Sequence, residues 1–138
     1  HKGVMSSVIF HFYNQIRDTG KLNLFRGSHG YSDGEQRRDF VYVKDTIDIK
    51  VWFMENNISG IYNVGTGKSR SFNDVANSVI DFHKSGHINY IDFPRALERQ
   101  YQAFTEADLT NLRNAGYKGI STELEDGVKS YLSFLSDA

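Results

Sequence analysis

The residue types best suited to chemistry gather around a charged pair, Arg38-Asp39, that precedes the short apolar run Phe40–Val43. The fork of donors on a planar guanidinium can bond two oxyanions at once, so Arg38 is a candidate phosphate ligand. An isolated arginine before a strand is more often an ordinary surface residue. The choice between a phosphate ligand and a surface arginine therefore depends on the neighbouring sequence.

A second candidate is the turn Phe25-Arg26-Gly27-Ser28, which joins an expected strand to a glycine-rich loop. Backbone amides and a serine hydroxyl at such a turn can hold ribose or phosphate oxygens, and the aromatic ring offers a stacking surface. Tyr101 precedes an expected helix cap, where a core or lid aromatic is the plainer interpretation.

Two residues near the start have side chains that could move protons or contact a substrate. Lys2 could act as an acid or base only if it faces a cleft, where desolvation or a neighbouring cation lowers its pKa; otherwise it is a solvated lysine. His11 lies seven residues after Val4, on a similar face of an expected helix. A half-buried structural histidine and a substrate contact both fit that position.

Several classes of function are disfavoured by composition. The net charge is −1, with no Lys/Arg run, so nothing indicates nucleic-acid binding. No apolar run approaches the ~20 residues that span a bilayer. There are no cysteines, and the five histidines lack zinc-binding spacing, so we expect no metal site. Gly65-Thr66-Gly67-Lys68-Ser69 is not a phosphate-binding P-loop, because Tyr62 occupies the position of its first glycine.

Hydrophobic periodicity predicts helices alternating with short strands, and hence an α/β fold. Asp45 should cap a helix with Ile47, Val51, Trp52 and Met54 on its buried side. Thr105 should cap a helix over 106–114, and capping boxes should open helices at Ser71 and Thr122. The remaining expected elements are a helix over 4–18 and strands over 22–25, 40–43, 60–64 and 88–93, with a loop over 27–37.

The phrases Arg38–Val43 and Gly60–Gly67 are similar to the C-terminal half of the extended short-chain dehydrogenase/reductases that act on nucleotide-sugars. The start His1-Lys2-Gly3 and the segment Arg99–Thr105 resemble the members that act on ADP-heptose. The resemblance covers essentially all of residues 1–138, with collinear spacing. It implies the substrate-binding C-terminal portion of such an enzyme. The Rossmann core that binds NADP would lie upstream, because neither its glycine fingerprint nor a Tyr-x-x-x-Lys pair occurs in this sequence.

What the resemblance implies about activity is an NADP-dependent oxidation of the heptose C6″ alcohol, followed by hydride return to the other face. Lys2 would be a catalytic acid/base and a cofactor contact. The substrate ADP-heptose would be bound by Val4, His11, Phe25, Arg26, Gly27, Ser28, Arg38 and Tyr101. The resemblance also implies a cytoplasmic homo-oligomer that binds neither nucleic acid nor membrane.

Two departures from the family pattern bear on these roles. Val4 stands where a small polar residue is usual. The loop between Ser28 and Arg38 is longer than usual, so Arg37 could take the phosphate role in place of Arg38. A related nucleotide-sugar 4-epimerase, a 4,6-dehydratase and a non-catalytic binding module of the same fold remain as alternatives.

Overall fold

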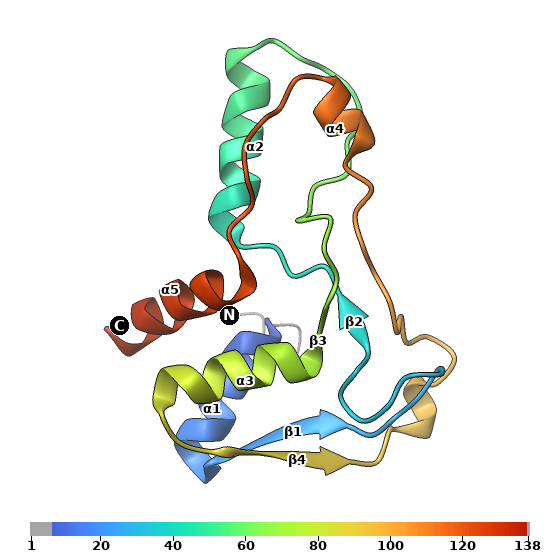
Figure 1. The fold of residues 1–138 in the computed structure, drawn as a ribbon, viewed down its shortest axis with the longest axis vertical. Helices are drawn as coiled ribbons and strands as arrows, with labels where there is room; N and C mark the ends of the chain where they lie inside the picture. The colour runs from blue at the N-terminus through green and yellow to red at the C-terminus, as the bar shows by residue number, and fades with distance from the viewer. Residues whose placement is uncertain (1–6, 138) are drawn as a thin grey trace.

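Helix α1 (Val8–Thr19) opens the part of the chain, residues 7–137, that the computed structural model describes (Figure 1). It ends as predicted before Gly20, whose left-handed backbone (φ 68°) lets its amide donate to the Ile16 carbonyl. Phe12 and Ile16 are its buried residues.

The main sheet is a parallel pair, β1 (Lys21–Phe25) and β4 (His87–Ile91), with Lys21 opposite His87 and Phe25 opposite Ile91. β1 confirms the strand predicted over 22–25, and its alternation buries Leu22 and Leu24. Strand β4 was also expected, but it ends two residues earlier than predicted.

Helices α3 (Phe72–His83) and α5 (Leu124–Ser136) complete the core with α1 and β1. The predicted capping box of α3 is present: Ser71 Oγ accepts from the Asp74 amide, and Asp74 accepts from the Ser71 amide. The core residues are Phe12, Ile16, Leu22, Leu24, Val75, Ala76, Val79, Leu124, Val128 and Leu132.

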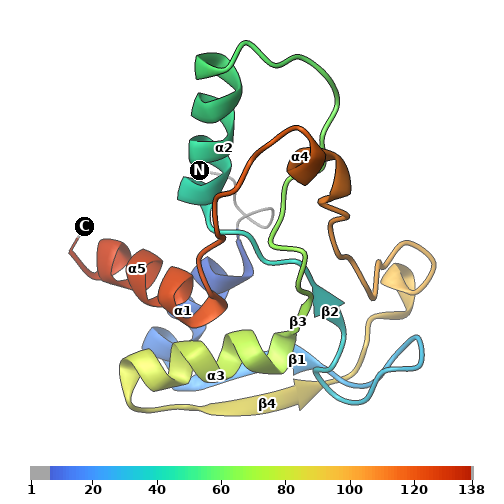
Figure 2. The ribbon, with the colours of Figure 1, turned by 45° about the horizontal axis from the view of Figure 1, so that its top comes forward.

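Beyond the loops that follow β1 and β4, the rest of the chain forms an arm that extends away from these two strands. It contains α2 (Val43–Glu55) and α4 (Thr110–Asn114), which lie together at the top of Figures 1 and 2. Trp52 of α2 packs on Tyr117 just after α4, with ring centroids 5.3 Å apart. A short antiparallel pair, β2 (Arg37–Arg38) and β3 (Arg70–Ser71), joins the arm to the core. The 3-10 turn η2 (Arg95–Leu97) follows β4.

Two predicted strands, over 40–43 and 60–64, are wrong. The only pairing near the first is the short β2, and α2 already begins at Val43 after the N-cap Tyr42. Residues 60–64 have no regular secondary structure and pair with no strand among residues 7–137. A strand requires a neighbour for its backbone N–H and C=O groups, and hydrophobic sequence alone cannot supply one.

Three predicted helix caps are wrong. Thr122 does not cap α5, whose N-cap residue is Glu123, and no side chain caps that helix. Asp45 lies inside α2, and its carboxylate accepts from the amide and hydroxyl of Thr122. Thr105 Oγ1 accepts from the Asp39 amide, so the following helix starts only at Thr110. Long-range partners therefore replaced local capping.

The predicted buried side of α2 is largely exposed. Ile47, Val51 and Met54 are 51%, 44% and 78% exposed, and Val43 on the same stripe is 62% exposed. Only Ile49 is buried on this helix. The periodicity correctly predicted an apolar face, but no described element covers that face. No helix among residues 7–137 is long and apolar enough to cross a membrane.

Candidate functional site

Four aromatic rings from three separate segments meet beyond the ends of β1 and β4. Tyr101 is the common member: its ring centroid lies 6.3 Å from Phe25, 4.9 Å from Phe93 and 5.9 Å from His29. Phe25 also packs edge-on against Phe93 at 5.1 Å. We call Phe25, His29, Phe93 and Tyr101 the ring cluster.

Arg38 extends over this cluster. Its guanidinium carbon is 5.4 Å from the Tyr101 centroid, and Nη1 donates to Gln102 Oε1 over 3.1 Å. The guanidinium therefore lies on an aromatic face with donors left for an anion. Burial raises the pKa of Tyr101, while the charge of Arg38 opposes that rise, so the phenol stays protonated and can donate at neutral pH.

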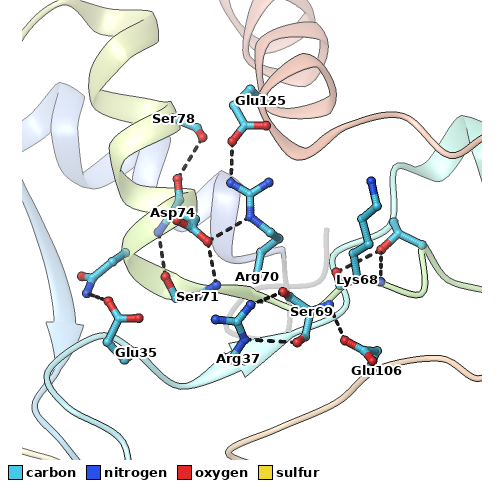
Figure 3. Close-up of polar contacts among 12 residues, drawn as sticks. Glu35, Arg37, Lys68, Ser69, Arg70, Ser71, Asp74, Ser78, Glu106 and Glu125 are labelled. Atoms are coloured by element: carbon cyan, nitrogen blue, oxygen red, sulfur yellow. Dashed lines mark hydrogen bonds and ion pairs between the residues drawn. The ribbon is translucent and has the colours of Figure 1, made fainter.

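Arg37 points to a different place, as Figure 3 shows. Its Nε donates to Ser69 Oγ over 3.1 Å and its Nη2 to the Ser69 carbonyl over 2.5 Å. The Ser69 amide in turn donates to Glu106. The Arg37 side chain thus links β2 to Ser69, in the segment just before β3. Of the two arginines, only Arg38 is directed toward the ring cluster.

Asp39 anchors the backbone next to Arg38, because its side chain is bound to two other segments of the chain. Its carboxylate accepts from the amides of Thr66, Gly67 and Ala107 over 2.8–3.0 Å and from Thr66 Oγ1 over 2.6 Å. Burial alone would raise the pKa of Asp39, but these hydrogen bonds hold it below its ordinary value.

The same contacts explain the Gly-Thr-Gly phrase. At Gly65 a Cβ atom would lie 2.5 Å from Asp39 Oδ2, so a side chain there would displace the carboxylate. The amides of Thr66 and Gly67 in this turn donate to the chain's own Asp39, so they are not free to bind a phosphate.

The turn at residues 25–28 is tightly built. At Gly27 a Cβ atom would lie 2.6 Å from the Tyr31 carbonyl oxygen, and the Gly27 amide donates to Asp33 Oδ1 over 2.7 Å. Gln36, only 1% exposed, donates through Nε2 to the Arg26 carbonyl and to Ser28 Oγ, both over 3.0 Å. The Arg26 side chain is exposed and pairs with Asp33 and Asp92 at 3.8 and 3.3 Å.

A network of ion pairs fixes β3 to the two helices beside it. Arg70 donates to Asp74 of α3 over 2.9 Å and to Glu125 of α5 over 2.6 Å (Figure 3). The bond to Glu125 and then that to Asp74 raise the pKa of Arg70, and Arg70 lowers the pKa of Glu125. Since β3 pairs with β2, the network also supports the strand that carries Arg38.

The remaining predicted site residues are not brought into this cluster. His11 is half-buried on α1, and within residues 7–137 its ring contact is with Phe10 of the same helix, 6.2 Å away. Lys2 and Val4 lie outside the described residues. Among the described residues, no group of three or more potential ligands could hold a metal ion.

Sequence reasoning missed the roles of Asp39, His29, Gln36 and Phe93. For Asp39 a signal was present, because an acidic residue directly after Arg38 points to the opposite side of an extended backbone. For Gln36 and His29 the only signal was the unusual length of the loop.

The arrangement confirms the predicted α/β fold, and it is similar to the fold of nucleotide-sugar epimerases over about two fifths of their length. Residues 1–65 match the model of the NAD dependent epimerase/dehydratase family. A UDP-N-acetylglucosamine 4-epimerase from Methanobrevibacter ruminantium M1 has the same fold, with a TM-score of 0.79 and 24% identity over 98% of this chain and 41% of that one.

The predicted resemblance to one kind of enzyme is also confirmed. The chain is 50% identical, over its whole length, to the ADP-L-glycero-D-manno-heptose-6-epimerase of Alkalilimnicola ehrlichii, of which it covers 43%. The structure of the Helicobacter pylori ADP-L-glycero-D-manno-heptose-6-epimerase matches with a TM-score of 0.80 and 27% identity, over 99% of this chain and 40% of that one. The chain spans about two fifths of the length of these relatives.

Proposed function

We propose that this chain is the substrate-binding portion of an enzyme that interconverts the C6″ epimers of ADP-glycero-D-manno-heptose. The observation that carries the proposal is the meeting of three segments, each of which the family resemblance assigned to the substrate. Tyr101 contacts both Phe25 and Arg38, and Phe25 begins the turn that contains Ser28. This combines an aromatic surface for a base or sugar with a guanidinium and hydroxyl for phosphate oxygens.

The direction of Arg38 supports its assignment to the phosphates over Arg37. A guanidinium bound to Ser69 would have to break two hydrogen bonds before reaching an anion. To bind a phosphate oxygen, Arg38 would have to give up one hydrogen bond, to the exposed side-chain amide of Gln102. Arg26 and Ser28 would supply further contacts from the other side of the ring cluster.

We assign the binding of NADP mainly to an N-terminal domain outside this sequence. The Gly-Thr-Gly turn offers no free cradle for its pyrophosphate, because the amides of Thr66 and Gly67 donate to Asp39. The cofactor would supply hydride acceptance and return at C6″. The chain's own task is to hold the ADP-heptose and, through Lys2, to exchange the alcohol proton.

The exposed apolar stripe on α2 is consistent with a separate N-terminal domain that binds NADP. Val43, Ile47, Val51 and Met54 recur on one helix face, as expected of a helix that packs on another layer. We propose that the cofactor domain covers this face. We also propose a cytoplasmic homo-oligomer that acts in lipopolysaccharide inner-core heptose synthesis.

The direct test is to incubate the full-length enzyme and NADP with ADP-D-glycero-D-manno-heptose and follow inversion at C6″ by NMR. Conversion to the L-glycero epimer supports the proposal. Inversion at C4 of a UDP-sugar, without conversion of the heptose, would assign the chain to a 4-epimerase instead.

Replacing Arg38 by alanine in the full-length enzyme should weaken ADP-heptose binding by about 1.5–3 kcal/mol, the range for hydrogen bonds to charged groups. Arg38→Lys should restore only part of the affinity, because an ammonium lacks the bidentate fork. Isothermal titration of the NADP-saturated enzyme measures both. Arg37→Ala is the matched control and should leave the affinity near that of the parent. A loss in Arg37→Ala, with none in Arg38→Ala, would reverse the assignment.

The isolated chain of residues 1–138 should not bind NADP with micromolar affinity. The pyrophosphate needs a glycine turn at a helix N-terminus, and that fingerprint is absent from the sequence. Fluorescence titration of NADPH against the isolated chain and the full-length enzyme compares the two directly. Equal affinity would show that the dinucleotide site lies in this chain.

A further inference from the structure

His29 occupies the tip of a loop that is firmly held at its base. On α3, the Asn73 amide donates to the Gly34 carbonyl, and Asn73 Nδ2 donates to the Asp33 carbonyl over 2.9 Å. Asn73 Oδ1 accepts from the Tyr90 hydroxyl of β4 over 2.9 Å. The loop therefore leaves the core in a fixed direction, and its tip reaches the opposite segment.

The backbone of His29 is itself unusual. Its φ of 55° lies in the left-handed region, which residues other than glycine rarely adopt. The turn is closed by the Tyr31 amide, which donates to the Ser28 carbonyl over 3.0 Å. Glycine would adopt this conformation without cost, so the contacts of the His29 side chain have to account for its presence there.

The side chain of His29 joins the loop to the segment after β4. Its ring packs edge-on against Phe93 at 5.7 Å and lies tilted against Tyr101 at 5.9 Å. Its Nε2 is 2.9 Å from the Glu98 carbonyl oxygen, to which it donates in the tautomer that carries the proton on Nε2. His29 thus contacts Tyr101 directly and also fixes the backbone three residues before it.

We propose that His29 is a positioning residue, which holds Tyr101 under the Arg38 guanidinium and so sets the affinity for the nucleotide-sugar. The inference rests on the proposed function, because it requires that Tyr101 and Arg38 contact the substrate. His29 itself takes no part in the chemical step, so its removal changes binding and leaves turnover at saturation near the parent rate.

The test uses full-length enzyme saturated with NADP and titrated with ADP-glucose as the probe. His29→Gly keeps the left-handed backbone accessible while removing the ring and the hydrogen bond. We expect its Kd for the probe to rise about 3- to 30-fold, because the contact with the Tyr101 ring and the hydrogen bond to Glu98 are lost. For the heptose substrate, KM should rise similarly, with kcat unchanged. His29→Phe keeps the ring alone and should recover part of the affinity. Ser32→Ala, at an exposed position of the same loop, is the control and should match the parent.

A second comparison separates positioning from general stability. In a Tyr101→Ala background, His29→Gly should have no further effect on the Kd, because the residue through which it acts is gone. An equal loss in both backgrounds, or an unchanged Kd in His29→Gly, would overturn the inference. If the parent enzyme itself does not bind ADP-glucose but converts the heptose, the Kd comparison moves to the heptose substrate with the same expected outcomes. If the parent neither binds nor converts an ADP-sugar, the proposed function falls, and this inference falls with it.

Discussion

Replacing Lys2 by methionine in the full-length enzyme is expected to slow interconversion of the C6″ epimers by roughly 10²–10⁴-fold, the usual cost of losing a general acid or base. The change removes the ammonium but keeps an unbranched side chain of similar length, so the fold and substrate affinity should be nearly intact. In the proposed mechanism, the tyrosine of an upstream Tyr-x-x-x-Lys pair exchanges the alcohol proton in one substrate orientation and Lys2 exchanges it in the other. The tyrosine would still act in its own orientation. Oxidation or reduction of a ketone or aldehyde analogue should therefore persist in part. Measuring epimer exchange and NADPH formation side by side separates the two effects.

The control for this experiment is Lys129→Met, which removes an exposed lysine from α5. It should retain the parent rate of epimer exchange. Normal exchange in Lys2→Met would remove Lys2 from the mechanism and leave it as a solvated residue. Equal loss of both activities, with weaker NADP binding, would assign Lys2 to the cofactor alone.

The second large effect is expected at Asp39. Asp39→Ala should lower the free energy of unfolding of the full-length enzyme by about 2–4 kcal/mol, because several hydrogen bonds to one carboxylate are lost together. The amides of Thr66, Gly67 and Ala107 would lose their acceptor, and Arg38 would lose the anchor next to it. Urea unfolding measures the loss of stability. Asp81→Ala, at an exposed position of α3, is the matched control and should change stability little.

The charge of Asp39 also predicts a pH dependence. Its pKa is lowered in the folded chain, so its contribution to stability is present above the unfolded value of about 3.9 and is lost as the pH falls through the lower folded value. The stability difference between the parent and Asp39→Asn should be constant above about pH 5 and should shrink below about pH 4. A difference that does not change over that range would show that the carboxylate's charge contributes nothing.

The sequence by itself determined the elements whose partners are close in the chain. The Ser71 cap finds Asp74 three residues later, and the left-handed Gly20 ends α1 from its own backbone. The alternation of Leu22 and Leu24 fixed which face of β1 is buried. The resemblance to nucleotide-sugar epimerases likewise followed from contiguous phrases, such as Arg38–Val43.

Only the tertiary structure decided the features that depend on partners far away in the chain. Residues 60–64 have the composition of a strand but find no strand to pair with among the described residues, so they form no regular secondary structure. Arg37 and Arg38 are indistinguishable in sequence, and their directions were settled by Ser69 on one side and Tyr101 on the other. Asp39 is bound to amides 27 to 68 residues away. No local propensity encodes such contacts, because hydrogen bonds and ring contacts form only between groups that the complete fold brings within a few ångströms.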